Sequence, residues 1–243
     1  MKRKAYTIAE AMVTMAIVGI VASLTIPSFV AAYRKHIYAN SLATAVANFE
    51  TGMTMMMAKE GVDDLLDTEA WKVINNSMTN SSSSTVIKEF RKNINKTLPV
   101  AEYKTAEIKY SSLASPASSP NLVSGKPVRF PTKNGVEYML HISGVSKANE
   151  KDEATSYSSG SNFLNKAGEV YIDINGDNEP NIQGRDWFRY DLGTDGRLYP
   201  YGGKDSCIYR GMGYTSPKTK CVTNKDGHYC GAYLKENGYK MDY

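Results

Sequence analysis

The hydrophobic pattern divides the first 60 residues into two parts. From Ala11 to Tyr33 the chain carries no charged residue over 23 positions. As a helix this stretch would be roughly 34 Å long, enough to cross a bilayer core of about 30 Å. Farther on, apolar residues recur at steps of three to five, which predicts an amphipathic continuation ended by Gly61. Its apolar face would comprise Tyr33, Ile37, Leu42, Val46, Phe49, Met53, Met56 and Met57.

The pattern after residue 61 predicts short helices followed by strands. Helical spacing marks residues 64–74 and 86–98, and from residue 127 the period changes to two. Asn134-Gly135 between two alternating runs is typical of a hairpin. Residues 169–174 form a third predicted strand, and residues 187–199 form a second predicted hairpin around Gly193 to Gly196. We therefore predict an α+β fold in which one helix, from about residue 6 to 60, packs its second half on an antiparallel sheet.

Glu10, at the front edge of the uncharged stretch, restricts how the N-terminus is interpreted. A carboxylate is costly in lipid unless it is paired. A signal peptide has a shorter apolar run, and a plain membrane anchor leaves Glu10 without a partner. Cleavage between Ala5 and Tyr6 would free an amine four residues before Glu10. That ammonium and the carboxylate could neutralise each other within a subunit or between packed subunits.

The residues Ala5-Tyr6-Thr7-Ile8-Ala9-Glu10, followed by a long apolar helix, resemble the prepilin cleavage and methylation motif. This motif belongs to type IV pilins and type II secretion pseudopilins. Counted from Tyr6, Glu10 is the fifth residue, and Gly19 and Pro27 fall at the fourteenth and twenty-second positions, as in that family. Ala5 replaces the commoner Gly, and Tyr6 the commoner Phe.

The resemblance implies a pilin-like organisation. Residues 1–5 would be a leader peptide removed by prepilin peptidase, which would also methylate the Tyr6 amine. Residues 6–32 would be a transmembrane and filament-core helix, 33–60 its amphipathic continuation, and 61–243 the globular domain. We expect Glu10 to control assembly and Pro27 to kink the helix. The chain would cross the bacterial inner membrane once with its domain outside the cytoplasm, and would then join a filament in the periplasm or on the cell surface.

The implied partners are copies of the chain or other pilin-like subunits, the inner-membrane assembly machinery and membrane lipid. Lysine and arginine total 29 against 25 acidic residues. Because three of the basic residues lie in the predicted leader, the processed chain is nearly neutral, and we expect no nucleic-acid partner. The sequence also contains no catalytic motif around its isolated histidines, so we do not expect an enzyme.

Cysteine and oxygen-bearing side chains provide two further predictions. Cys207, Cys221 and Cys230 are disulfide candidates, and we predict a Cys207–Cys221 pair because a turn-rich segment separates them. Oxygen side chains also alternate after the third strand and could bind Ca²⁺; some major pseudopilins carry calcium in C-terminal loops. A solvated turn explains the same pattern. The four calcium candidates are Asp173, Asn175, Asp177 and Glu179.

The sequence therefore favours a structural subunit of a type IV pilus-like or type II secretion-like filament. A membrane-anchored extracytoplasmic binding module, as in minor pilins that serve adhesion or DNA uptake, is the alternative. In that case the helix would only hold the domain at the membrane.

Overall fold

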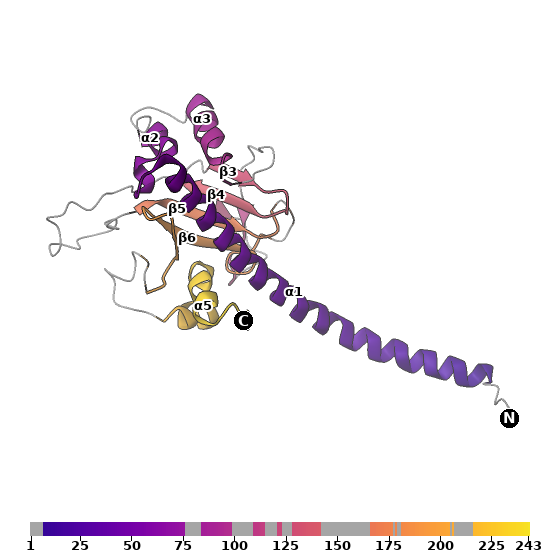
Figure 1. Cartoon of the computed structure of the whole chain (residues 1–243). Helices are drawn as coiled ribbons and strands as arrows, with labels where there is room; N and C mark the ends of the chain where they lie inside the picture. Colours follow the sequence, from indigo (N-terminus) through magenta and orange to yellow (C-terminus); the bar gives the residue numbers. More distant parts are fainter. Residues whose placement is uncertain are drawn as a thin grey trace.

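The computed structural model describes residues 7–75, 84–98, 109–114, 121–122, 128–141, 166–176, 178, 181–204, 206 and 216–243. A long N-terminal helix, α1, runs across one face of an antiparallel sheet, and its first half projects away from the domain (Figure 1). The helical elements are α1 (Ile8–Glu60), η1 (Leu65–Asp67), α2 (Glu69–Asn75), α3 (Ser84–Ile94), η2 (Thr219–Thr223), η3 (Gly227–Tyr229) and α5 (Cys230–Glu236).

The main sheet has five strands in the order β3-β4-β5-β6-β7, and every neighbouring pair is antiparallel. A second, two-stranded sheet pairs β1 with β2. The strands are β1 (Lys109–Tyr110), β2 (Asn121–Leu122), β3 (Val128–Pro131), β4 (Glu137–His141), β5 (Lys166–Asp173), β6 (Trp187–Gly193) and β7 (Leu198–Pro200). The structure therefore confirms the α+β layout and both predicted hairpins.

Helix α1 begins and ends as its sequence dictates. Thr7 caps the first turn, and Gly61 ends the helix in the left-handed conformation with φ of 66°. Glycine adopts this conformation without steric cost, which is why it commonly follows a helix. Tyr6, the predicted first residue of the helix, lies outside the described residues.

The second half of α1 provides one wall of the core. Leu42, Phe49, Met53, Met56 and Met57 are buried, as the period predicts. Tyr33 and Ile37 are instead exposed, so the packed face begins only at the half-buried Tyr38. The domain contacts Lys35 but leaves Tyr33 and Ile37 exposed, although the apolar period continues through both.

The opposite wall of the core is the inner face of the sheet. Alternate residues of β4 and β6, such as Tyr138 and Tyr190, belong to the same buried cluster as the α1 residues. The Tyr138 ring lies 5.2 Å from that of Phe49, and its hydroxyl donates to the Ala45 carbonyl at 2.9 Å. Burial raises the pKa of Tyr138 well above its usual range, so this hydroxyl stays a donor.

Glu50 of α1 and Gly196 of the β6–β7 turn also hold the sheet against α1. The Leu198 amide of β7 donates to the Glu50 carboxylate at 2.9 Å, although the sequence places Glu50 on the polar side of the helix. Gly196 in the β6–β7 turn has φ of 77°, and a side chain there would come within 2.9 Å of Met57. The turn therefore needs glycine both for its backbone conformation and for its close approach to α1.

Candidate assembly surface

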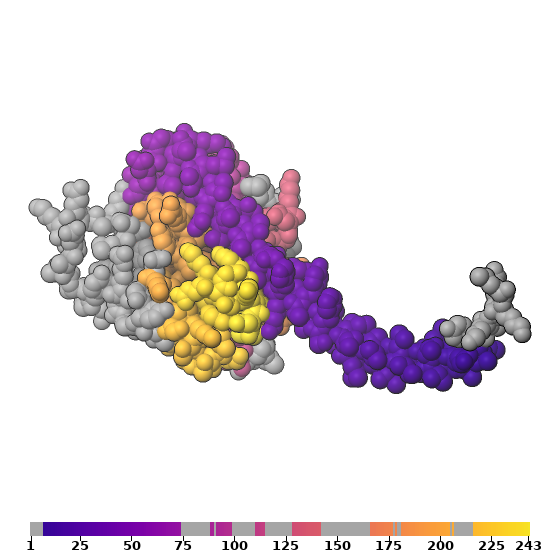
Figure 2. Space-filling view, turned by 60° about the horizontal axis from the view of Figure 1, so that its bottom comes forward, coloured from indigo at the N-terminus to yellow at the C-terminus, as the bar shows by residue number. Residues whose placement is uncertain are grey.

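The first half of α1 is an apolar surface that the described chain leaves uncovered. In Figure 2 it extends beyond the domain, and its most apolar stretch is not buried at all. A single chain rarely exposes so large an apolar surface to water, which indicates that lipid or other protein normally covers it. By length and composition α1 could cross a membrane. The large exposed side chains between residues 8 and 33 are Ile8, Met12, Val13, Met15, Ile17, Val18, Ile20, Val21, Leu24, Ile26, Phe29, Val30 and Tyr33.

The hydroxyl groups within this surface bond to the helix itself. Thr14, Ser23, Thr25 and Ser28 each donate to a carbonyl three or four residues earlier, at 2.8 to 2.9 Å. Such bonds satisfy the hydroxyl donors without water. The surface can therefore lie in an apolar environment without leaving these protons unpaired.

At its N-terminal end, α1 is closed by a reciprocal pair of side chains. A Glu10 carboxylate oxygen accepts from the Thr7 amide and the Thr7 hydroxyl, both at 2.9 Å, while the Thr7 hydroxyl accepts from the Glu10 amide. This capping box satisfies two otherwise unpaired amides of the first turn. The sequence interpretation missed it, although Thr at one position and Glu three residues later is its usual signal. Ala5 and Tyr6 lie outside the described residues.

Pro27 lies inside α1, which continues unbroken through it. Proline lacks an amide hydrogen, so the carbonyl of Ser23 has no donor from this position. The loss of one bond therefore does not end the helix, and the predicted kink stays a prediction.

The candidate calcium segment closes on itself after β5. The Asp173 carboxylate accepts from the amides of Asn175 and Gly176 at 3.1 and 2.9 Å. The Asn175 side-chain amide donates to the Asn178 carbonyl at 2.6 Å. In the described ranges no three acidic, histidine or cysteine side chains converge as metal ligands, and Asp177 and Glu179 lie outside those ranges. The calcium site stays a prediction, and the two described candidates act as turn residues.

A second buried acid, Asp186, lies near Asp173, because it directly precedes Trp187, the residue that pairs with Asp173 between β5 and β6. Burial raises the pKa of Asp173 to about 8, and the charges of Asp186 and Glu137 add to this effect. Burial likewise raises the pKa of Asp186 to about 7. Both carboxyls therefore hold protons at a pH at which exposed carboxyls have lost theirs.

The face of the sheet opposite the core and α1 carries a network of buried charges around Glu169. Its carboxylate lies 2.8 Å from the Lys166 amine and 2.9 Å from the Arg189 guanidinium, and it accepts from the Tyr171 hydroxyl at 3.0 Å. Burial favours the neutral acid, but His141, Lys166 and Arg189 outweigh it and hold the pKa of Glu169 well below its usual range. The ionised form is therefore part of the folded state.

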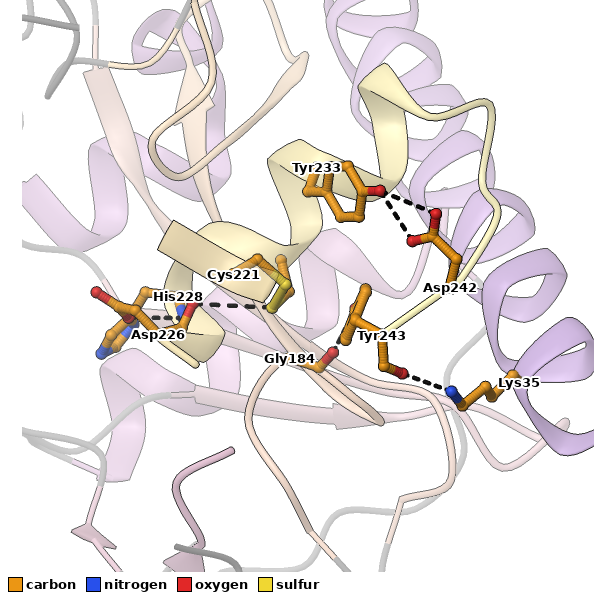
Figure 3. Close-up of a disulfide and its surroundings, with 9 residues drawn as sticks. Lys35, Gly184, Cys221, Asp226, His228, Tyr233, Asp242 and Tyr243 are labelled. Carbon is orange, nitrogen blue, oxygen red and sulfur yellow. Dashed lines mark hydrogen bonds between the residues drawn. A yellow bond between two sulfur atoms is a disulfide. The ribbon is translucent and has the colours of Figure 1, made fainter. Parts of the chain in front are cut away.

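The disulfide joins Cys221 to Cys230, not Cys207 to Cys221 as predicted (Figure 3). Cys221 lies in η2 and Cys230 begins α5, and the chain reverses between them so that the two Cα atoms are 4.9 Å apart. Both sulfurs lie in the main core cluster. Cys207 lies outside the described residues. A turn-rich intervening segment is thus a weaker guide to pairing than the fold of the two flanking helices.

The segment after the disulfide returns to α1. The Tyr243 hydroxyl donates to the Gly184 carbonyl at 2.5 Å, and the Lys35 amine donates to the Tyr243 main-chain oxygen at 2.6 Å (Figure 3). Tyr233 also donates to Asp242 within this segment, at 2.8 Å. These contacts fasten residues 216–243 beside the point at which α1 leaves the domain.

No protein-family model, characterised protein or solved structure matches this chain. The assignment of function therefore rests on its residues and their arrangement.

Proposed function

We propose that this chain is a structural subunit of a type IV pilus-like or type II secretion-like filament. The observation that carries the proposal is the division of α1. One half holds the domain, whereas the other half is an uncovered apolar rod. Lipid covers such a rod before assembly, and the rods of neighbouring subunits cover one another in a filament core.

Assembly of this kind follows from repeated head-to-tail contacts that do not close into a ring. Each subunit would add its rod to a central bundle and present its domain outside. Cleavage between Ala5 and Tyr6 would place a free amine near Glu10. In an apolar bundle, a misplaced subunit would leave the amine or the carboxylate unpaired, at a cost of roughly 3–5 kcal/mol. The charge pair would therefore select one register.

The capping box sharpens the test of Glu10, because the same side chain caps the helix. A Glu10→Gln variant keeps an oxygen that can accept from the Thr7 amide but loses the charge. We expect Glu10→Gln and Glu10→Ala both to lower the yield of sheared filaments strongly. Glu89→Ala, which removes one exposed charge from α3, is the matched control and should leave the yield unchanged. Full filament yield from Glu10→Gln would overturn the charge-pair mechanism.

Two further measurements separate filament subunit from membrane-anchored binding module. The intact mass of chain taken from membranes should show the loss of residues 1–5 and the gain of one methyl group. A photo-cross-linker at the exposed Val18 should give a ladder of oligomers. Cross-linked species no larger than one chain would favour the module, in which the helix serves as an anchor.

A further inference from the structure

A groove of about 500 Å³ lies where α1 enters the domain. One wall is a single face of α1, and the other comes from three separate segments that include the C-terminal one. The groove begins at Pro27, within the uncharged stretch, and extends past the first charged residues to Tyr38. Its volume is within the range of pockets that bind small molecules. The groove therefore spans the boundary between the apolar and polar parts of the helix.

The groove combines an apolar lining with positive charge. Pro27, Val30 and Ala31 supply apolar surface from α1, and Arg34 follows one turn later. Arg185 reaches the same groove from the loop before β6, and the described residues that line it include no acidic side chain. Within the described part of the chain, neither Arg34 nor Arg185 has an ion-pair partner. Two guanidinium groups therefore remain available to an anion beside apolar surface.

We propose that this groove binds one anionic phospholipid, with its phosphate between Arg34 and Arg185 and an acyl chain along Pro27 and Val30. The inference rests on the proposed membrane-anchored state of the chain. In that state the uncharged stretch ends at Tyr33, so Arg34 lies at the level of the lipid headgroups. Guanidinium groups suit phosphate because they offer paired donors in one plane.

Charge decides between a lipid and a second copy of the chain. The apolar rod of a neighbouring subunit could fill the groove, but it has no acidic residue between Ala11 and Tyr33 to offset the arginines. Burying these cations beneath an uncharged helix would remove their hydration without compensation. An anionic lipid supplies both the charge and the apolar chain, and in this way it would fix the domain against the membrane surface.

Lipid retention by the full chain tests the proposal. The chain is extracted in a neutral detergent, supplied with dioleoylphosphatidylglycerol or dioleoylphosphatidylcholine, and measured by native mass spectrometry. We expect one phosphatidylglycerol to stay bound, and Arg34→Gln/Arg185→Gln to bind it about tenfold more weakly. Arg34→Lys/Arg185→Lys should retain most of the binding. Lys59→Gln/Arg197→Gln, which removes two exposed charges elsewhere on the domain, should bind as the unchanged chain does.

Each other outcome overturns the lipid assignment. Equal retention of phosphatidylcholine would show that the groove does not select an anion, and equal retention by Arg34→Gln/Arg185→Gln would show an unspecific lipid shell. Full competition by glycerophosphoglycerol, which lacks acyl chains, would indicate a headgroup site alone. If Arg34→Gln/Arg185→Gln lost chain dimers and not bound lipid, a second copy of the chain would be the occupant of the groove. An unchanged thermal midpoint of the variant confirms that it is folded.

The result is separable from the test of the filament. Lipid binding with normal filaments from Glu10→Gln would retain this inference and reject the charge-pair mechanism. If Glu10→Ala lost filaments as expected but the chain bound no lipid selectively, the charge-pair mechanism would be retained and this inference rejected. Recovery of the whole chain in the soluble fraction would reject both.

Discussion

The two halves of α1 share one unbroken helix but have different surroundings. Phe29 in the first half is 71% exposed, whereas Phe49 in the second half is 1% exposed. Hydroxyls bond to their own helix in both halves, whereas in the second half a carbonyl and a carboxylate of α1 also bond to the sheet. The comparison teaches that helix formation and tertiary packing are separate properties of this element. We therefore expect only the second half to contribute to the stability of the domain.

Removing a large side chain from each half gives the largest expected contrast. Phe49→Ala leaves a cavity against Tyr138 and should lower the free energy of unfolding by about 3–5 kcal/mol. Phe29→Ala should leave it unchanged, because no domain residue covers that ring. Chemical unfolding of the full chain in detergent, followed by tryptophan fluorescence, measures both. A comparable loss from Phe29→Ala would show that the first half is part of the folded domain.

The disulfide tests whether the domain also depends on the segment that returns to α1. Replacing both Cys221 and Cys230 by Ser opens a short loop and should cost about 2–3 kcal/mol of domain stability. The helicity of the first half, read by circular dichroism in detergent, should remain. Cys207→Ser is the comparison variant and should cost little. A loss from Cys207→Ser as large as that from the double replacement would contradict the observed pairing.

Domain stability should depend on pH, whereas the helicity of the apolar half should not. Asp173 and Asp186 have folded-state pKa values raised to about 8 and about 7, so the folded state binds protons that the unfolded chain releases above about pH 4. Stability should therefore fall between pH 5 and pH 8, by up to about 6 kcal/mol for the two carboxyls together. Glu169, whose pKa is lowered, stabilises above its unfolded pKa, and that contribution is lost only in more acidic solution.

Urea unfolding at pH 5 and pH 8 measures this slope. Asp173→Asn keeps an oxygen that can accept from the Asn175 and Gly176 amides but cannot ionise, so it should flatten the dependence. An unchanged slope in Asp173→Asn would assign the pH dependence to other groups. An increase in the free energy of unfolding on adding calcium at pH 8 would instead favour the predicted metal site.

The smallest expected effect concerns the polar contact between α1 and the sheet edge. Glu50→Ala removes the acceptor for the Leu198 amide and should cost about 1–2 kcal/mol. Asn48→Ala, on the exposed side of the same turn, is the matched control and should change stability little. Equal effects of the two variants would show that β7 does not depend on this bond.

Local rules predicted most of the elements. The spacing of apolar residues and Gly61 predicted α1 and its end, and Asn134-Gly135 between alternating runs predicted the β3–β4 hairpin. These properties depend on neighbours along the chain, so a short window of sequence contains the necessary information. The assembly role of Glu10, inferred from the sequence motif around it, stays a prediction.

The remaining features depend on how the elements fold against one another. The sequence alone determined that this protein has an apolar rod joined to an amphipathic helix and an antiparallel sheet. Only the tertiary structure decided that Cys221 pairs with Cys230, that Glu50 accepts from β7 and that Arg34 and Arg185 line one groove. Such pairings follow from how the elements pack together, because a side chain's partners across the core leave no periodic signal in the chain.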